Sequence, residues 1–435
     1  MISYALDLNA CPGELRQGLA EIKADYAHRF SDGPRARPLV FIKDPEREAG
    51  GLEASKEPDR IAVKYGRKTD AFRALGRLLG ESGQAAIRAD FCETPRFDAL
   101  GVMVDCSRNG VVRPEALSQL LRRWALMGLN LCLLYTEDTY TVPDEPFFGY
   151  LRGRYTWEEL KALDAYADAL GIEMVPCIQT LGHLEQILQW PAYAERRDTA
   201  GVILANDDKT YLLLEKMIAS VSAPFRSRRI HIGMDEAHGV GTGRYRQLFG
   251  TENPFQIMNR HLKRVRSLCR NIGLRPMIWS DMYFRLASKT GSYYDPEARV
   301  PRHVAAGIPR GVDLVYWDYY HTDQAFYEDW IERHRALGSE PVFASGTWTW
   351  NRFWAALPYS LAATDAALRA CKVGKLRQAF TTLWGDDSME CHPLSAQPAI
   401  QFFAEHGYAD RVEDDLLRAN FRGVCGGDFD AWVRA

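Results

Sequence analysis

Eight short apolar runs recur along most of the chain, separated by stretches in which apolar residues have helical spacing. The runs fall at residues 100–104, 130–135, 173–178, 229–233, 276–280, 314–317, 342–345 and 379–384. Apolar positions three and four apart predict helices at 114–127, 157–170, 211–221, 255–272, 323–337 and 359–371. Strands alternating with helices in this way are typical of a (β/α)8 TIM barrel, so we predict an α/β fold with that architecture.

The first 90 residues have shorter elements and a different order. Apolar runs predict strands at 4–8, 38–43 and 60–65, and helical spacing predicts helices at 12–30 and 69–79. A less patterned segment after Gly83, through Asp90 and Pro95, is typical of a connector. We therefore predict a small N-terminal α/β domain at residues 1–90 and a catalytic barrel at 91–435.

Composition and charge narrow the class of protein. The chain has 435 residues, 46% of them hydrophobic, and a formal net charge of −3, as expected of a globular protein with a large core. It has no long basic run and no apolar stretch of membrane-spanning length, so we expect neither nucleic acid nor a membrane as a partner. The absence of a secretory leader pattern and the odd count of nine cysteines favour a cytoplasmic protein.

The candidate chemistry lies after the apolar runs, because TIM barrels build their active sites at the carboxyl ends of their strands. Acids and aromatic residues dominate there, at 105–109, 136–140, 179–183, 235–236, 279–281, 316–320, 346–350 and 384–387. Lysine is absent from these positions, which excludes a Schiff-base lysine. Indoles stack on sugar rings and carboxylates bind hydroxyls, so the pattern favours a carbohydrate pocket with tryptophan walls formed by Trp279, Trp348, Trp350 and Trp384.

Asp235 and Glu236 are the candidate catalytic pair. Cleaving a glycosidic bond requires an acid that protonates the leaving oxygen and a group that stabilises the developing cation. Neighbouring residues on a strand point to opposite faces, so both carboxyls can serve one pocket only if the chain leaves strand geometry near Gly233. We predict that His231 is a buried supporting side chain and assign no role to His238. The scattered histidines and the lack of a CxxC pair predict no metal and no cofactor.

The segment His231-Ile232-Gly233-Met234-Asp235-Glu236 resembles the His-x-Gly-x-Asp-Glu signature of glycoside hydrolase family 20, the β-N-acetylhexosaminidases. Tyr316-Trp317-Asp318 is similar to the family's Tyr-x-Asp after the sixth strand, and Trp384-Gly385-Asp386 is similar to its Trp-x-acid after the eighth. The resemblance covers residues 97–403, and the residues before Pro95 resemble the small domain that commonly precedes the family's barrel.

This resemblance implies a retaining, exo-acting enzyme with substrate-assisted catalysis. The acetamido oxygen of the substrate would attack the anomeric carbon and form an oxazolinium intermediate, with Asp235 holding the acetamido N–H. Glu236 would act first as acid and then as base, with a pKa raised towards neutrality. The family pattern further implies that Tyr316 binds the acetamido carbonyl, that Asp318 and Asp386 bind sugar hydroxyls, and that Trp279, Trp348, Trp384 and His183 line the pocket.

The sequence departs from the family pattern at the first strand. Leu100 stands before Gly101, where members commonly carry an arginine that grips the 3- and 4-hydroxyls of the sugar. We expect Arg108, Glu137 and Asp138 to take over that contact, and the choice between N-acetylglucosamine and N-acetylgalactosamine stays open. Met234 replaces a second glycine and is expected to fill core. The expected partner is an oligosaccharide or small molecule with a terminal N-acetylhexosamine, and the oligomeric state stays open.

Three rival interpretations remain. A retaining glycosidase could use Glu236 as acid and Asp281 or Asp318 as a protein nucleophile, and would then need no acetamido group on its substrate. A carbohydrate-binding barrel could keep the pocket without turnover. A metal-dependent hydrolase or deacetylase would need a histidine cluster at the strand ends, where only His183 qualifies.

Overall fold

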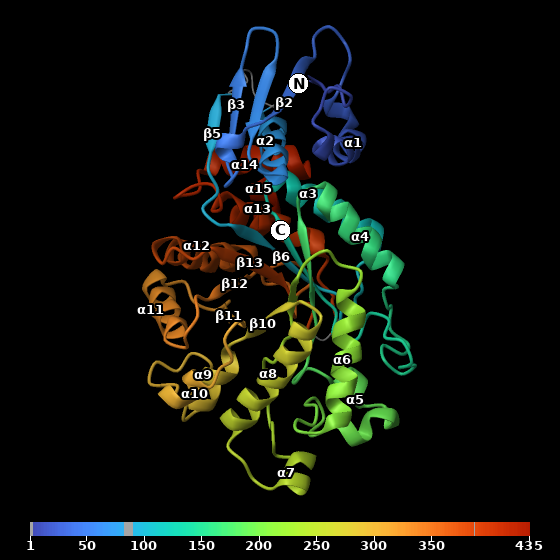
Figure 1. Cartoon of the computed structure of the whole chain (residues 1–435). Helices are drawn as coiled ribbons and strands as arrows, with labels where there is room; N and C mark the ends of the chain where they lie inside the picture. Colours follow the sequence, from blue (N-terminus) through green and yellow to red (C-terminus); the bar gives the residue numbers. More distant parts are fainter. Residues whose placement is uncertain (1–2, 82–89, 387) are drawn as a thin grey trace.

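A closed barrel of eight parallel strands forms the larger part of the molecule (Figure 1). The computed structural model describes residues 3–81, 90–386 and 388–435, so the first half of the predicted connector, residues 84–89, and Asp387 lie outside the described residues. The barrel strands are β6 (Ala99–Asp105), β7 (Leu131–Tyr135), β8 (Glu173–Cys177), β9 (Arg229–His231), β10 (Arg275–Trp279), β11 (Asp313–Trp317), β12 (Val342–Gly346) and β13 (Gln378–Leu383). Each overlaps one predicted run, and pairing of β13 with β6 closes the ring, so the predicted TIM barrel is confirmed.

Helices surround the barrel as the apolar spacing predicted. The six predicted helices are α3 (Pro114–Met127), α4 (Trp157–Ala169), α6 (Asp208–Ser222), α8 (Pro254–Asn271), α11 (Gln324–Arg335) and α12 (Leu357–Val373). A capping box between Thr156 and Glu159 fixes the start of α4. The unpredicted helices are α5 (Glu185–Leu188), α7 (Arg244–Phe249), α9 (Asp281–Ala287), α10 (Arg302–Ala306), α13 (Gln397–Glu405), α14 (Asp414–Cys425) and α15 (Phe429–Arg434), together with the 3-10 turns Pro191–Arg196 and Pro393–Ala396.

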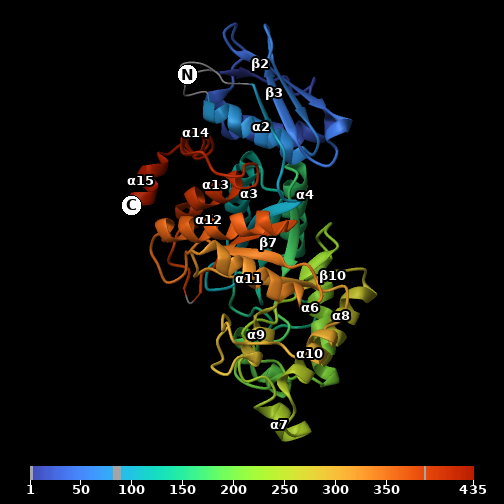
Figure 2. The ribbon, with the colours of Figure 1, turned by 90° about the vertical axis from the view of Figure 1, so that its left-hand side faces the viewer.

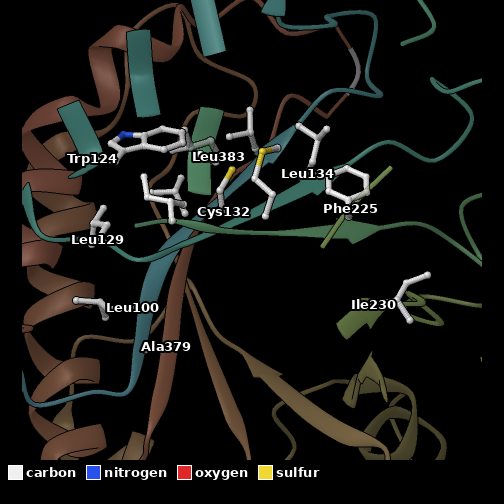
Figure 3. Close-up of a cluster of buried hydrophobic side chains, with 14 of the residues drawn as sticks. Leu100, Trp124, Leu129, Cys132, Leu134, Phe225, Ile230, Ala379 and Leu383 are labelled. Atoms are coloured by element: carbon white, nitrogen blue, oxygen red, sulfur yellow. The ribbon is translucent and has the colours of Figure 1, made fainter. Parts of the chain in front are cut away.

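Alternating side chains divide the core into two layers. In β7, Leu131, Leu133 and Tyr135 point into the barrel, whereas Cys132 and Leu134 face the helices. Figure 3 shows part of the outer layer, in which Trp124 of α3 lies near Cys132. This alternation decides which residues just beyond each strand can reach the barrel mouth.

The N-terminal residues form a separate five-stranded sheet in the order β1-β2-β4-β3-β5. Its strands are β1 (Tyr4–Ala5), β2 (Arg37–Lys43), β3 (Leu52–Lys56), β4 (Ile61–Tyr65) and β5 (Phe91–Glu93), and its helices are α1 (Arg16–Asp25) and α2 (Lys68–Glu81), with 3-10 turns at Gly13–Leu15, Ala27–Arg29 and Pro45–Arg47. The apolar pattern missed β3, which has only two buried residues, and β5, which is three residues long. Because β5 lies past residue 90, the sheet extends beyond the predicted boundary.

Helix α2 joins the N-terminal sheet to the last helices of the chain, and lies beside α14 in both views (Figures 1 and 2). The guanidinium of Arg73 in α2 is buried between two carboxylates, with Nε 2.9 Å from Glu93 and Nη2 2.6 Å from Glu405 of α13. The Tyr26 hydroxyl donates to the Val424 carbonyl of α14 at 2.6 Å. The N-terminal domain is therefore tied to the C-terminal helices by buried polar contacts.

The state of the cysteines and the character of the helices relate to the expected cytoplasmic location and to the expectation that the protein has no membrane partner. All nine cysteines are free thiols, and seven of them are buried. Within residues 3–81, 90–386 and 388–435, no helix combines the length and the apolar character that crossing a bilayer requires. The cytoplasmic location stays a prediction.

Candidate active site

The segment after β9 carries the two candidate catalytic carboxylates into one cavity. β9 ends at His231, and Gly233, Met234 and Glu236 then have φ values of +69°, +77° and +44°. A Cβ on Gly233 would lie 1.9 Å from the Gln179 side-chain oxygen, so only glycine fits this turn. The chain thus leaves strand geometry, as predicted, and Asp235 and Glu236 both line the cavity at the barrel mouth.

Gln179, directly after β8, fixes the orientation of Asp235. Its side-chain oxygen accepts from the backbone N–H of Met234 at 3.0 Å. Its side-chain nitrogen donates to Oδ1 of Asp235 at 2.6 Å and to the Tyr135 hydroxyl at 2.9 Å. One buried amide therefore supports both the turn and the carboxylate that follows it.

His183 lies between the two carboxylates. Its Nε2 is 3.3 Å from Oδ2 of Asp235 and 3.4 Å from Oε2 of Glu236. Burial alone would lower the pKa of His183, but the two carboxylates raise it well above the ordinary value. Burial likewise opposes ionisation of Asp235, yet the His183 charge and hydrogen bonds hold the pKa of Asp235 below its usual value. The pair is therefore an imidazolium facing an ionised aspartate.

Glu236 has different contacts on its two oxygens. Oε2 faces His183, and Oε1 accepts a hydrogen bond of 3.0 Å from the Tyr293 hydroxyl. The hydrogen bond to His183, reinforced by Tyr293, lowers the pKa of Glu236 although partial burial opposes this. The expectation that the surroundings raise this pKa towards neutrality is therefore wrong for the protein alone, because two donors favour the carboxylate.

Aromatic rings form much of the wall of the cavity that the two carboxylates line. The lining rings are Trp279, Trp317, Tyr319, Tyr320, Trp350 and Trp384. The Trp384 indole N–H donates to the Tyr319 hydroxyl at 3.0 Å, and Trp317 stacks on Tyr319 with ring centroids 5.1 Å apart. These contacts hold the rings in fixed positions. Their apolar faces can stack on a sugar ring, and the N–H and O–H groups at their edges can form hydrogen bonds.

The structure places Tyr316 and Asp318 away from this cavity, contrary to prediction. Val315 points into the barrel, so Tyr316 points outward, where its ring stacks on His334 of α11 with centroids 4.5 Å apart. The Tyr316 hydroxyl donates to Asp318, whose carboxylate also contacts His321. Residues of the opposite parity, Trp317 and Tyr319, reach the cavity instead.

Two further predicted contacts do not line the cavity. Trp348 stacks behind Trp350 with ring centroids 5.3 Å apart, and only Trp350 reaches the lining. Asp138 is buried, with Oδ1 3.5 Å from Nη2 of Arg152, and it lines neither this cavity nor the adjoining one. Both side chains support lining residues or loops.

Arg108, Glu137 and Asp386 lie together at an adjoining cavity that His183 and Glu236 also line. The Arg108 guanidinium is 3.1 Å from Asp105 and 3.2 Å from Glu137. It lies over the Tyr135 and Trp384 rings, at 5.0 and 5.2 Å from their centroids. Arg108 borders both cavities, so of the three residues expected to replace the family arginine, Arg108 and Glu137 are in reach and Asp138 is not.

His231 has the supporting position that the sequence predicted. It is fully buried, its Nδ1 accepts from the Gly233 N–H at 3.1 Å, and its ring packs against Trp279. Burial lowers the pKa of His231 to about 3, so the ring is neutral. Among the described residues, no group of three or more histidine, cysteine, aspartate or glutamate side chains is arranged to hold a metal ion.

Several site residues were missed by the sequence reasoning. Trp317 and Tyr319 could have been found by continuing the strand alternation from Val315 past the end of β11, whereas Tyr320, which also lines the cavity, breaks that alternation. Gln179 stands at a strand end, but its residue type gave no chemical signal. Tyr293 lies in the loop between α9 and α10, where no sequence pattern indicates a contact with Glu236.

The barrel matches a family model and two kinds of relatives. Residues 100–294 match the model of the glycosyl hydrolase family 20 catalytic domain. Hexosaminidase D from Homo sapiens is 28% identical over 214 residues, which are 47% of this chain and 41% of that protein. The β-hexosaminidase subunit beta from Homo sapiens is 21% identical over 327 residues, which are 67% of this chain and 58% of that protein. The chain thus spans about half the length of these relatives.

Solved structures share the fold over nearly the whole chain. The GH20 exo-β-N-acetylglucosaminidase from Vibrio harveyi, in complex with N-acetylglucosamine, has a TM-score of 0.71 at 15% identity and covers 100% of this chain and 74% of that one. The Streptomyces plicatus N-acetyl-β-hexosaminidase has a TM-score of 0.69 at 17% identity, and the match covers 98% of this chain and 92% of that one. At these identities the likeness establishes the fold.

Proposed function

The chain belongs to glycoside hydrolase family 20, and we propose that it is a retaining, exo-acting β-N-acetylhexosaminidase that uses substrate-assisted catalysis. The observation that carries the proposal is the convergence of Asp235 and Glu236 on one aromatic-walled cavity, with His183 between them. The hexosaminidase relatives, and the Vibrio harveyi structure with its bound N-acetylglucosamine, support the substrate class.

Asp235 suits the role of positioning the acetamido group. Gln179 and His183 hold its carboxylate in one orientation and keep it ionised. An ionised aspartate accepts the acetamido N–H, directs the acetamido oxygen to the anomeric carbon and stabilises the cationic oxazolinium ring. Attack by that oxygen and then by water inverts the anomeric carbon twice, which gives net retention.

Glu236 must protonate the leaving oxygen and then deprotonate the attacking water. About a third of its side chain (35%) is exposed, so a bound sugar would remove water from it. Desolvation raises the pKa of a carboxyl group, which opposes the effect of His183 and favours the acid form in the complex. The leaving group takes that proton, and the same carboxylate regains one from water.

The contacts of Asp281 and Asp318 count against a protein nucleophile. Oδ2 of Asp281 accepts from the Glu236 backbone N–H at 3.1 Å, and Oδ1 accepts from the Trp317 indole at 3.2 Å. Burial and the charge of Asp235 raise the pKa of Asp281 to about 8. Asp318 faces Tyr316 and His321, outside the cavity. Both oxygens of each carboxylate are therefore already engaged by groups of the protein.

We assign recognition of the sugar hydroxyls to the adjoining cavity, which Arg108, Glu137 and Asp386 line. Arg108 is held by two carboxylates, and it lies beside Asp386 and Glu137 along the lining. A guanidinium donates and carboxylates accept, so the set can bind neighbouring hydroxyls of a terminal sugar. We propose that it replaces the family arginine and selects between the gluco and galacto epimers.

The direct test is hydrolysis of 4-nitrophenyl N-acetyl-β-glucosaminide, N-acetyl-β-galactosaminide and β-glucoside by wild type, Asp235→Asn and Glu236→Gln. We expect turnover of the acetamido sugars alone, retention of configuration by NMR, and losses of about 100-fold or more in both variants. The ratio of the two acetamido substrates ranks the epimers. Asp281→Asn serves as the discriminating variant.

Each rival has its own result in this experiment. Cleavage of the plain glucoside, with a collapse in Asp281→Asn equal to that in Glu236→Gln, would replace the proposal by a protein nucleophile. Binding of N-acetylglucosamine without turnover of any glycoside would favour a carbohydrate-binding barrel.

A further inference from the structure

A chain of three hydrogen-bonding groups runs from Glu236 to the surface. The Tyr293 hydroxyl lies 3.0 Å from Oε1 of Glu236 and 2.6 Å from Nε2 of His238. Glu236 is half-buried, and His238 is exposed. No sequence pattern indicated a role for Tyr293 or His238, yet both lie within two hydrogen bonds of the proposed acid/base.

The loop between α9 and α10 holds Tyr293 in place. The neighbouring residue, Tyr294, donates its hydroxyl to the Trp317 carbonyl at 2.7 Å, and its ring meets the Trp317 and Trp330 rings edge-on. Arg285 of α9 donates to the Gly291 carbonyl and lies over the Tyr293 ring. Anchors on both sides therefore fix where the Tyr293 hydroxyl lies, while its single proton can still rotate.

That single proton allows two complete hydrogen-bond arrangements. When Glu236 is a carboxylate, Tyr293 donates to Oε1, and His238 donates its Nε2–H to the tyrosine oxygen. When Glu236 carries a proton on Oε1, it donates to the tyrosine oxygen, and Tyr293 donates to Nε2 of a His238 whose ring proton is on Nδ1. Both arrangements satisfy Oε1 of Glu236, the Tyr293 hydroxyl and Nε2 of His238.

We propose that Tyr293 and His238 are a positioning pair for Glu236, in which the Tyr293 hydroxyl turns between the two neighbours and holds the carboxyl group in both of its protonation states. The inference rests on the proposed function, because only a group that acts first as acid and then as base needs support in both states. A phenylalanine at position 293 could hold neither state.

Other charged groups also act on Glu236, so the pair is one influence among several. The charged groups that face Glu236, Tyr293 or His238 from neighbouring segments are Asp235, His183, Asp281, Arg285, Arg108, Glu137, Glu185 and Asp386. Burial and the charge of Arg285 lower the pKa of His238, which keeps its ring neutral and able to accept from Tyr293. Tyr293 lowers the pKa of Glu236 by donating to the carboxylate.

The test compares Tyr293→Phe, His238→Leu and the double variant with wild type, using two N-acetyl-β-glucosaminides. The disaccharide N,N′-diacetylchitobiose has a poor leaving group and needs the acid, whereas the 2,4-dinitrophenyl glycoside has a good one and does not. For Tyr293→Phe we expect kcat/KM to fall about tenfold on the disaccharide and less than about threefold on the dinitrophenyl glycoside. On the latter, kcat should still fall, because hydrolysis of the intermediate uses Glu236 as base.

Two further readouts separate positioning from a general structural defect. The alkaline limb of kcat/KM should move up by about half a pH unit or more in Tyr293→Phe, because the carboxylate loses a donor. His238→Leu should lower kcat/KM when it is made in the wild-type protein, but should cause no further loss when it is added to Tyr293→Phe, because His238 acts through Tyr293. Tyr150→Phe, on an exposed loop, is the matched control and should behave as wild type.

The outcomes are distinguishable. Equal losses on both leaving groups, an unmoved alkaline limb, or additive effects of the two substitutions would each overturn the positioning pair. A wild-type protein that cleaves neither substrate would overturn the proposed function instead.

Discussion

Gly233→Ala is the substitution that most directly tests how the turn after β9 builds the site. Gly233 has a φ of +69°, and a Cβ there would lie 1.9 Å from the side-chain oxygen of Gln179 and 2.8 Å from the Ile178 carbonyl. Alanine can fit only if Gln179 moves. That amide donates to Asp235 at 2.6 Å, so its displacement frees the carboxylate to rotate.

The expected size of the effect follows from two terms. A non-glycine residue in the left-handed region costs roughly 1–2 kcal/mol of stability. A hydrogen bond to a charged group is worth about 1.5–3 kcal/mol, and its loss from the reacting arrangement lowers kcat/KM by roughly 10- to 150-fold. Activity should therefore fall more than the strain alone explains.

The assay is kcat/KM on 4-nitrophenyl N-acetyl-β-glucosaminide together with the melting temperature. Gly273→Ala is the matched control, because Gly273 has a φ of +76° and a Cβ there would meet nothing within 4 Å. It should lose stability from strain and keep its activity. Wild-type activity in Gly233→Ala, or equal losses of activity in the two variants, would refute the reasoning that Gln179 orients Asp235.

Two further predictions concern charged pairs. Asp235→Asn should bring the pKa of His183 down, because the carboxylate 3.3 Å from its Nε2 is a main cause of the raised value, and an unchanged NMR titration of the ring would contradict the ion pair. The raised pKa of His183 stabilises the fold at pH values below the unfolded-state pKa of about 6.5, and this stabilisation is lost as the pH rises through the folded-state pKa. The melting-temperature advantage of wild type over Asp235→Asn should therefore shrink in alkaline solution. Arg73→Leu should lower the unfolding free energy by about 3–5 kcal/mol in urea titrations, because Glu405 is left buried without its guanidinium. Arg377→Ala, which breaks a mostly exposed pair with Asp98, should cost less than about 1 kcal/mol, and similar losses in the two variants would contradict the argument from burial.

The barrel could be predicted from the sequence because its strands are buried on both faces and read as continuous apolar runs. The Asp235–Glu236 pair could be predicted because the strand-to-loop turn needs Gly233 and leaves a short, readable motif. Strand β3 was not predicted because two of its five residues are charged and only two are buried. Local patterns of this kind report burial along the element itself.

Local patterns of apolar residues do not predict contacts between segments that are distant in the sequence. Tyr316 and Asp318 were placed in the pocket by motif alone, whereas the side-chain alternation of β11 sends Tyr316 towards α11 and Tyr319 to the cavity. The lowered pKa of Glu236 depends on His183 and Tyr293, which lie 53 and 57 residues away in the chain and meet Glu236 only after the barrel closes. Spatial neighbours of this kind set the chemistry of the pair.

The buried contact between Arg73 and Glu405 has a consequence for synthesis of the protein. The two residues are 332 positions apart, so at about 5–20 residues per second Arg73 leaves the ribosome roughly 15 to 65 s before its partner. During that interval one face of α2 lacks the helices α13 and α14 that cover it in the finished molecule. The N-terminal domain is thus translated before the barrel but completes its packing only after the C-terminal helices have formed. Nascent chains stalled within the barrel would present this face of α2 to chaperones and proteases.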